Sequence, residues 1–87
     1  MSEDNVSNEV FEAYKDAVKK GKITEKETKL WDFVLSHYGI DEFSTKQLEK
    51  DFGDAAYATI RSFVLKFEEL GLLASTKYGT SVKYKVS

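Results

Sequence analysis

Apolar residues recur at helical spacing along most of this chain and change to a two-residue alternation only near its end. The longest helical pattern covers residues 54–73, DAAYATIRSFVLKFEELGLL, where apolar positions return every three or four residues and therefore share one helix face. Asp54 stands where an N-cap carboxylate accepts free amide protons, and Gly71 where a helix ends in a left-handed residue. A helix over residues 55–70 is predicted. Its apolar face comprises Ala56, Ile60, Phe63, Val64, Phe67 and Leu70, and its other face Tyr57, Ala58, Arg61, Ser62 and Lys66.

Two more helices are predicted before residue 40. An apolar stripe over residues 8–20 comprises Val6, Val10, Phe11, Tyr14, Ala17 and Val18, and Gly21 ends it. The sequence TEKE at residues 24–27 is a capping box that opens a helix over residues 25–38. That helix is apolar on two sides, with Trp31 expected in the core, so it should lie between the N-terminal helix and the C-terminal elements.

The C-terminal half predicts a short helix and a hairpin around the long helix. Residues 40–43 form a candidate extended segment, and the capping sequence STKQ at residues 44–47 opens a helix over residues 45–52 with Leu48 and Phe52 facing inward. After Gly71, two strands near residues 72–77 and 81–86 flank Gly79, which allows the positive φ of a tight turn. Inward residues Val82, Tyr84 and Val86 alternate with Lys83 and Lys85, whose face is expected to be solvated.

These elements predict a mainly α fold with a small antiparallel β-hairpin. A short helix, a turn containing glycine and a long helix form a helix-turn-helix, and the hairpin after it forms a wing. The expected organisation is an N-terminal tail and accessory helix over residues 1–23, followed by a winged helix-turn-helix domain over residues 24–87. The accessory helix is the one spare element through which the chain could form a homodimer.

Composition argues against several functions. The chain has 87 residues and no cysteine, which suits one small domain and excludes disulfides and thiolate metal sites. It contains no apolar run of membrane-spanning length and no signal-like N-terminus, so a soluble, cytoplasmic protein without a membrane partner is expected. No phosphate-binding glycine loop is present, and the single histidine, His37, is expected to pack in the core. We therefore expect no enzyme activity, no metal and no cofactor.

The charge distribution favours the C-terminal half for contact with an anionic partner. The net charge is −2, but residues 1–43 hold 6 basic and 10 acidic side chains while residues 44–87 hold 7 basic and 5 acidic ones. The half that contains the helix-turn-helix and wing is therefore the less acidic half.

The sequence FSTKQLEKDFGDAAYATIRSFVLKFEELGLL, followed by STKYGTSVKYKV, resembles winged helix-turn-helix domains of prokaryotic transcriptional regulators. The resemblance covers about residues 24–87. The sequence GKITEKETKLWDF and the helices after it also look like the C-terminal winged segment of some Fic-family proteins, whose histidine-containing catalytic loop is absent here.

Resemblance to the DNA-binding members implies a set of double-stranded DNA contacts. The long helix would enter the major groove, the start of the 45–52 helix would contact phosphate, and the hairpin would touch the backbone or minor groove. The matching positions are Tyr57, Ala58, Arg61 and Ser62 for bases, Thr45 and Lys46 for phosphate, and Lys77, Tyr78, Thr80 and Lys83 for the wing. Two departures from that pattern are the negative Asp54 and the single arginine on the reading face.

Two alternatives to DNA binding remain open. The acidic balance is also consistent with a winged helix that docks on a protein, or with a structural domain of a larger assembly, because fold alone does not fix function. In either case Arg61 would be a solvated charge, paired with Asp54 or Glu68.

Overall fold

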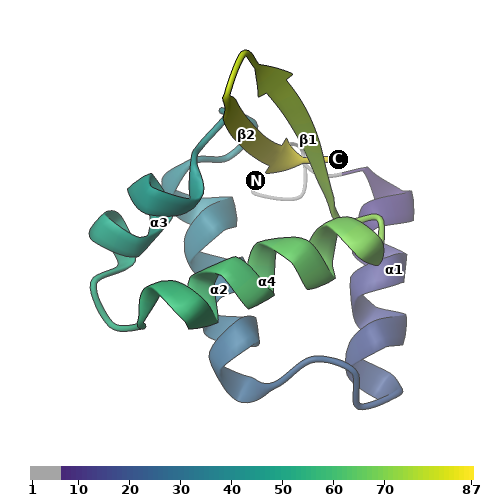
Figure 1. The fold of residues 1–87 in the computed structure, drawn as a ribbon. Coiled ribbons are helices and arrows are strands. Elements are labelled where there is room, and N and C mark those ends of the chain that lie inside the picture. The colour runs from purple at the N-terminus through teal and green to yellow at the C-terminus, as the bar shows by residue number, and fades with distance from the viewer. Residues whose placement is uncertain (1–6) are drawn as a thin grey trace.

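Four helices and a two-stranded hairpin make up the computed structural model, which describes residues 7–87 (Figure 1). The elements are α1 (Asn8–Lys19), α2 (Glu25–His37), α3 (Thr45–Phe52), α4 (Tyr57–Glu69), β1 (Leu73–Tyr78) and β2 (Ser81–Val86). The mainly α class with an antiparallel hairpin after a helix-turn-helix, predicted from the sequence pattern, is confirmed. Val6, which the predicted N-terminal stripe included, lies outside the described residues.

Three of these helices begin at a Ser or Thr side chain. The Ser7 and Ser44 hydroxyls accept the amides of Val10 and Gln47 at 3.2 and 3.0 Å, and Thr24 forms the predicted capping box with Glu27. Helix α4 differs, since Ala56 is its N-cap and no side chain caps it within residues 7–87. The expectation that Asp54 caps this helix is wrong, because the turn from α3 takes residues 53–56 and delays the start of α4.

Helix α2 lies between α1 on one side and α3 on the other, as its two apolar sides predicted. Trp31 stacks on Tyr14 of α1 with ring centroids 5.6 Å apart and packs against Phe67 of α4 at 5.3 Å. On the opposite side Phe33 meets Phe52 of α3 edge to face at 5.4 Å. Val10 of α1 belongs to the same buried cluster as residues of α2, α3, α4 and the hairpin, so α1 shares the core with them.

Two predicted core positions of the first helices face solvent instead. Phe11 and Val18 on α1 are 47% and 43% exposed, because the inward face of α1 is centred on Val10, Tyr14 and Ala17. The expectation that His37 is a core residue is also wrong. Its side chain is half exposed, stacks on Phe33 at 4.8 Å and lies 3.5 Å from Asp51 of α3.

The hairpin pairs in register from Leu73 opposite Val86 to Tyr78 opposite Ser81. Gly79 has a φ of 66° at the first position of the two-residue turn, where side chains are disfavoured. The extended segment expected at residues 40–43 pairs only at Phe43, which forms a β-bridge to Tyr84 with backbone N–O distances of 2.8 and 2.7 Å. This bridge holds the hairpin beside the start of α3. Within residues 7–87, no helix has the length and apolar character needed to cross a membrane.

Candidate functional site

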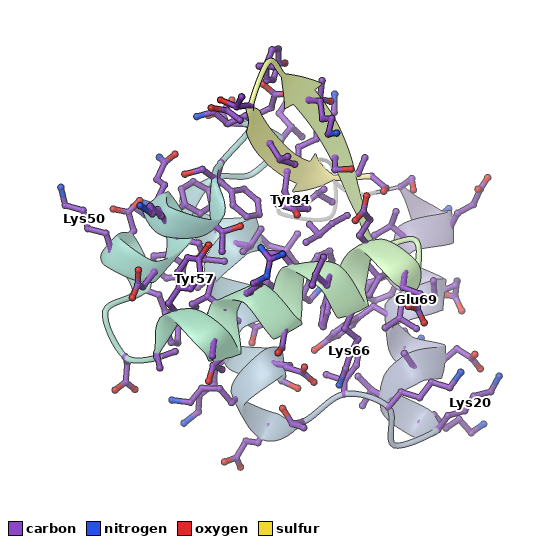
Figure 2. The ribbon with its side chains drawn as sticks, in the orientation of Figure 1. Lys20, Lys50, Tyr57, Lys66, Glu69 and Tyr84 are labelled. Carbon is purple, nitrogen blue, oxygen red and sulfur yellow. The ribbon has the colours of Figure 1, made fainter. Side chains whose placement is uncertain are left out.

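A groove of about 620 Å³ lies where α3, α4 and the hairpin meet. Its walls come from three segments that are distant in sequence but adjacent in the fold. The lining residues are Ser44, Thr45, Lys46, Tyr57, Arg61, Thr80, Ser81, Val82, Lys83 and Tyr84. In Figure 2, the labels of Tyr57 and Tyr84 mark the α4 side and the hairpin side of the groove.

Local structure explains why these side chains converge. Tyr57 and Arg61 are four residues apart on α4 and so lie one above the other on the same face. Ser44 caps α3 and directs its first turn into the groove. The bridge between Phe43 and Tyr84 then fixes β2 against that turn. The cap of α3 and the bridge to β2 therefore hold two walls of the groove beside each other.

Six of the ten residues that the sequence assigned to DNA contact line this groove. They are Thr45, Lys46, Tyr57, Arg61, Thr80 and Lys83. The other four, Ala58, Ser62, Lys77 and Tyr78, are exposed residues of α4 and β1 outside the lining. The resemblance to winged helix-turn-helix domains implied a shared role for these six residues, and the structure adds that they line one concave surface.

The Tyr78 side chain is engaged at the wing tip. Its hydroxyl lies 2.9 Å from both carboxylate oxygens of Glu42, in the segment that precedes α3. This hydrogen bond raises the pKa of the Tyr78 phenol. The contact places a negative charge beside the hairpin tip, where the family resemblance implied only a DNA-facing tyrosine.

Four lining residues were not assigned to the site from the sequence: Ser44, Ser81, Val82 and Tyr84. Ser44 was assigned only as a cap, and Tyr84 only as an inward-facing strand residue. An alternating pattern separates inward from outward positions but does not show that the tip of a long inward phenol reaches a second surface. That contact depends on how the hairpin packs against α3 and α4, which the order of residues does not show.

The groove has a positive charge imbalance. Lys46, Arg61 and Lys83 are among its ten lining residues, and none of the ten is Asp or Glu. The ion pairs within residues 7–87 lie elsewhere and join Lys20 to Asp16, Lys26 to Asp54, His37 to Asp51 and Lys66 to Glu27. Arg61 is therefore not paired with Asp54 or Glu68, as one reading of the sequence had expected. Glu68 instead accepts a hydrogen bond from Ser75.

Tyr84 forms the floor of the groove. The residue is 7% exposed, and its ring belongs to the core cluster at 6.4 Å from the ring of Phe43. Burial raises the pKa of the Tyr84 phenol, and the nearby Glu68 carboxylate adds to this while Arg61 opposes it. The phenol therefore stays protonated at neutral pH and can donate a hydrogen bond.

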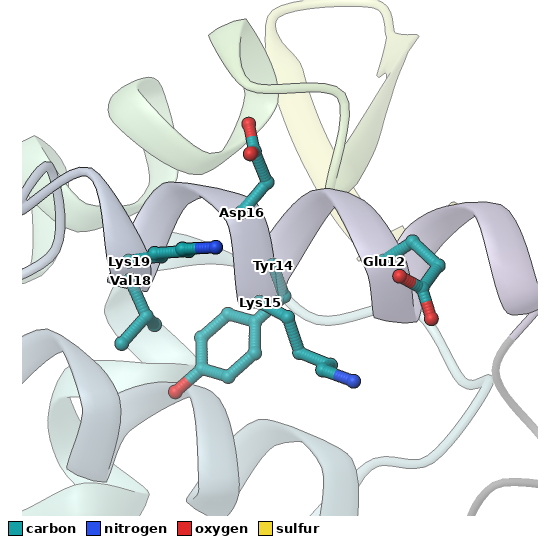
Figure 3. Close-up of a pocket in the computed structure, with 6 residues that line it drawn as sticks. All are labelled: Glu12, Tyr14, Lys15, Asp16, Val18 and Lys19. Atoms are coloured by element: carbon teal, nitrogen blue, oxygen red, sulfur yellow. The ribbon is translucent and has the colours of Figure 1, made fainter.

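A second hollow, beside α1, has a different character. It encloses about 540 Å³, and its described lining comprises Glu12, Tyr14, Lys15, Asp16, Val18 and Lys19, all from one helix (Figure 3). Two carboxylates balance two ammonium groups there. The groove between α3, α4 and β2 is the better candidate for a charged ligand, because its cations are not balanced in this way.

The remaining polar cluster joins α2 to α3. The Tyr38 hydroxyl donates to Asp51 at 2.8 Å, and burial together with this bond raises the pKa of the Tyr38 phenol. Within residues 7–87, no group of three His, Cys, Asp or Glu side chains could hold a metal ion. Neither a protein-family model nor a curated protein sequence matches this chain.

Proposed function

We propose that this chain is a DNA-binding winged-helix module, acting as a small transcriptional regulator or a DNA-tethering domain. Helix α4 would enter the major groove of duplex DNA, and the hairpin would lie against the backbone. The observation that carries the proposal is the convergence of Lys46, Arg61 and Lys83, from three separate elements, on one groove with no acidic lining residue. This convergence occurs in a chain whose net charge is −2, so it does not follow from overall composition.

The exposed surface of α4 suits close approach to base edges. Ala58 and Ser62 are small, exposed residues that follow Tyr57 and Arg61 by one position each along the helix. Small side chains allow a helix to lie deep in the major groove, which admits an α-helix and displays the hydrogen-bonding groups of each base pair.

The acidic residue near the start of α4 is compensated. Asp54 lies 3.6 Å from the Lys26 ammonium, which also donates to the Asp54 carbonyl at 2.8 Å. The departure noted in the sequence, a negative charge close to the proposed DNA surface, is thus partly neutralised by α2. An exposed pair of this kind contributes little to stability, but it does reduce the local repulsion of phosphate.

A second candidate function is docking on a protein. It is favoured by the exposure of Phe11 and Val18, which lie seven residues apart on α1 and so share one side of that helix. The homodimer expected through residues 8–20 would use the same side. Sedimentation of the full chain and of Phe11→Glu tests the homodimer. A dimer through α1 should dissociate in the variant. A wild-type chain that is monomeric at every concentration excludes the dimer.

Fluorescence anisotropy of a labelled duplex across a range of salt concentrations tests the DNA proposal. Neutralisation of about three phosphate charges by the groove cations Lys46, Arg61 and Lys83 predicts that the logarithm of the association constant falls with the logarithm of salt at a slope of about −2.7. Lys83→Ala should reduce the steepness of that slope by about one, whereas Lys85→Ala, on the same strand but outside the groove, should leave it unchanged. Absence of binding by the wild type at low salt refutes the proposal.

A further inference from the structure

We infer that the groove contains a specific phosphate-binding subsite, in which the Tyr84 hydroxyl, the Arg61 guanidinium and the first turn of α3 bind one phosphate group. The inference rests on the proposed function where that phosphate belongs to a DNA backbone. It also changes the role of Arg61, which the family resemblance assigned to base reading. Four observations support it.

The Tyr84 hydroxyl is a hydrogen-bond donor without a partner. No hydrogen bond within residues 7–87 involves this hydroxyl, although more than nine-tenths of the residue is buried. No side-chain polar atom that is fully buried in this part of the chain lacks a partner, so the Tyr84 oxygen is still reached by solvent. Tyr84 lines the groove, and Arg61, another lining residue, is close enough to act on its phenol.

Tyr84 is held rigidly by its surroundings. Its backbone exchanges two hydrogen bonds with Phe43, and its ring packs in the core. A hydroxyl at the end of such a ring loses little conformational entropy when it binds a ligand. A rigid, unpaired donor of this kind is typical of a prepared binding site.

The other walls of the groove supply further hydrogen-bond donors. The first-turn amides of Thr45 and Lys46 have no acceptor inside α3, because the opening amides of a helix precede its hydrogen-bonding pattern. Arg61 supplies a planar fork from α4, and Lys83 a third charge from β2. A tetrahedral anion with several acceptor oxygens satisfies donors from three directions better than a planar carboxylate does.

The lining of the groove around Tyr84 carries positive charge and no carboxylate. Arg61 and Glu68 both act on the Tyr84 phenol, and Tyr57 lies nearby. The Glu68 carboxylate accepts the Ser75 hydroxyl and is not part of the groove lining, whereas Arg61 and Lys83 are. Two cations thus line the groove beside Tyr84, whereas the Glu68 carboxylate, which acts more strongly on the phenol than Arg61 does, lies outside the lining.

Two sources of phosphate fit this chemistry. One is the backbone of duplex DNA, which would place Arg61 on phosphate and leave Ala58 and Ser62 as the base-facing residues of α4. The other is a free phosphate-bearing molecule such as a mononucleotide, since about 620 Å³ lies within the range of small-ligand sites. Both sources use the same donors, and the experiment below separates them.

The test compares Tyr84→Phe with the matched control Tyr14→Phe, which removes a hydroxyl from α1 on the other side of α2. Labelled duplexes of several sequences are titrated at fixed salt with both variants, with Arg61→Ala and with the wild type. We expect Tyr84→Phe to weaken binding about tenfold or more, the loss typical of one hydrogen bond to a charged group. For each of the two variants, Tyr84→Phe and Arg61→Ala, the loss of affinity should not depend on the DNA sequence of the duplex.

Inorganic phosphate and a nucleoside 5′-monophosphate are then titrated into the ¹⁵N-labelled protein without DNA. Both should shift the amide resonances of Thr45 and Lys46 in the wild type and shift them less in Tyr84→Phe. A monophosphate that binds more tightly than phosphate and competes with duplex supports a free ligand as the source, and the absence of such competition supports the backbone.

The outcomes that overturn the inference differ from those that overturn DNA binding. The subsite is refuted if Tyr84→Phe binds duplex with wild-type affinity. It is also refuted if Arg61→Ala loses affinity only for duplexes with a particular base pair at one position. Either result leaves the DNA-binding function standing. Phosphate shifts without any duplex binding remove the DNA-binding function and leave the subsite.

Discussion

The two cations of α4 have different environments although they are five residues apart. The Lys66 ammonium lies 2.9 Å from the Glu27 carboxylate and 3.0 Å from the Lys22 carbonyl, at the junction of α4 with the start of α2. Glu27 is 7% exposed, so its carboxylate is largely withdrawn from water, while the Lys66 side chain is 38% exposed. Arg61 is exposed and lines a groove with no carboxylate among its lining residues.

The difference follows from helix geometry. Five residues turn an α-helix through about 500°, so the two side chains point about 140° apart. Lys66 faces back toward α2 and holds α4 to it, while Arg61 faces the groove. One cation is therefore committed to the fold and the other is available to a ligand. If Lys66 stabilises the fold and Arg61 serves a ligand, substitutions on the different sides of α4 should have different effects.

Replacing Phe67 with alanine should have the largest effect on stability. The side chain is fully buried, with its ring 4.3 Å from Phe63 and 5.3 Å from Trp31. Loss of a buried phenylalanine and the cavity it leaves predict a decrease of about 3–5 kcal/mol in the free energy of unfolding. Urea unfolding measures this, and a decrease below about 1 kcal/mol would contradict the packing described for α4.

Replacing Lys66 should destabilise the fold, and replacing Arg61 should not. Lys66→Ala leaves the buried Glu27 carboxylate without its cation. Removal of one partner from a fully buried pair costs about 3–5 kcal/mol, and we expect about 1–3 kcal/mol here because the Lys66 side chain is 38% exposed. Arg61→Ala is the matched control on the same helix and should change the free energy of unfolding by no more than about 0.5 kcal/mol. Equal losses from the two variants would remove the proposed division.

The Glu27 pair also predicts a smaller effect of pH. Burial alone would raise the pKa of the Glu27 carboxyl, but the hydrogen bond from the Thr24 amide and the Lys66 ammonium outweigh burial and hold the pKa below its usual value of 4.5. A carboxyl with a lowered folded-state pKa stabilises the fold above its unfolded pKa. That contribution is lost as pH falls through the folded pKa.

Glu27→Gln should therefore make the stability of the protein less dependent on pH in the acid range. Urea unfolding of wild type and variant between about pH 6 and about pH 3 measures the change. Glu25→Gln, an exposed residue of the same helical turn, is the control and should behave like the wild type. The prediction is contradicted if, below about pH 4.5, the free energy of unfolding decreases no more in the wild type than in Glu27→Gln.

The sequence predicted the elements of this fold well because their signals are local. Caps at Thr24 and Ser44, the glycine at residue 79 and the apolar periodicities each act over a few residues. The errors came where tertiary contacts decide the outcome. Asp54 matched a cap by composition, yet the turn after α3 needed residues 53–56, and Lys66 appeared equivalent to Arg61 until α2 was placed beside it.

The candidate site was predictable only in part for the same reason. Lys46, Arg61 and Lys83 could be assigned to DNA contact only through the resemblance to winged helix-turn-helix domains, and the structure brings the three residues to one groove. Neither the free hydroxyl of Tyr84 nor the contact of Tyr78 with Glu42 could be anticipated, since each depends on how the hairpin packs against the start of α3.

The salt dependence of duplex binding by two triple variants tests the central claim most directly. One variant combines Lys46→Ala, Arg61→Ala and Lys83→Ala. The other combines Lys19→Ala, Lys20→Ala and Lys29→Ala and has the same net charge. These three lysines are exposed and lie on α1, at its C-terminal end and on α2 (Lys20 is labelled in Figure 2).

We expect the groove variant to lose nearly all of the wild-type slope of about −2.7, because the three cations that neutralise phosphate are gone, and the control to retain it. Equal reductions of the slope in both variants would mean that binding reflects overall charge and would contradict a DNA-binding groove between α3, α4 and β2.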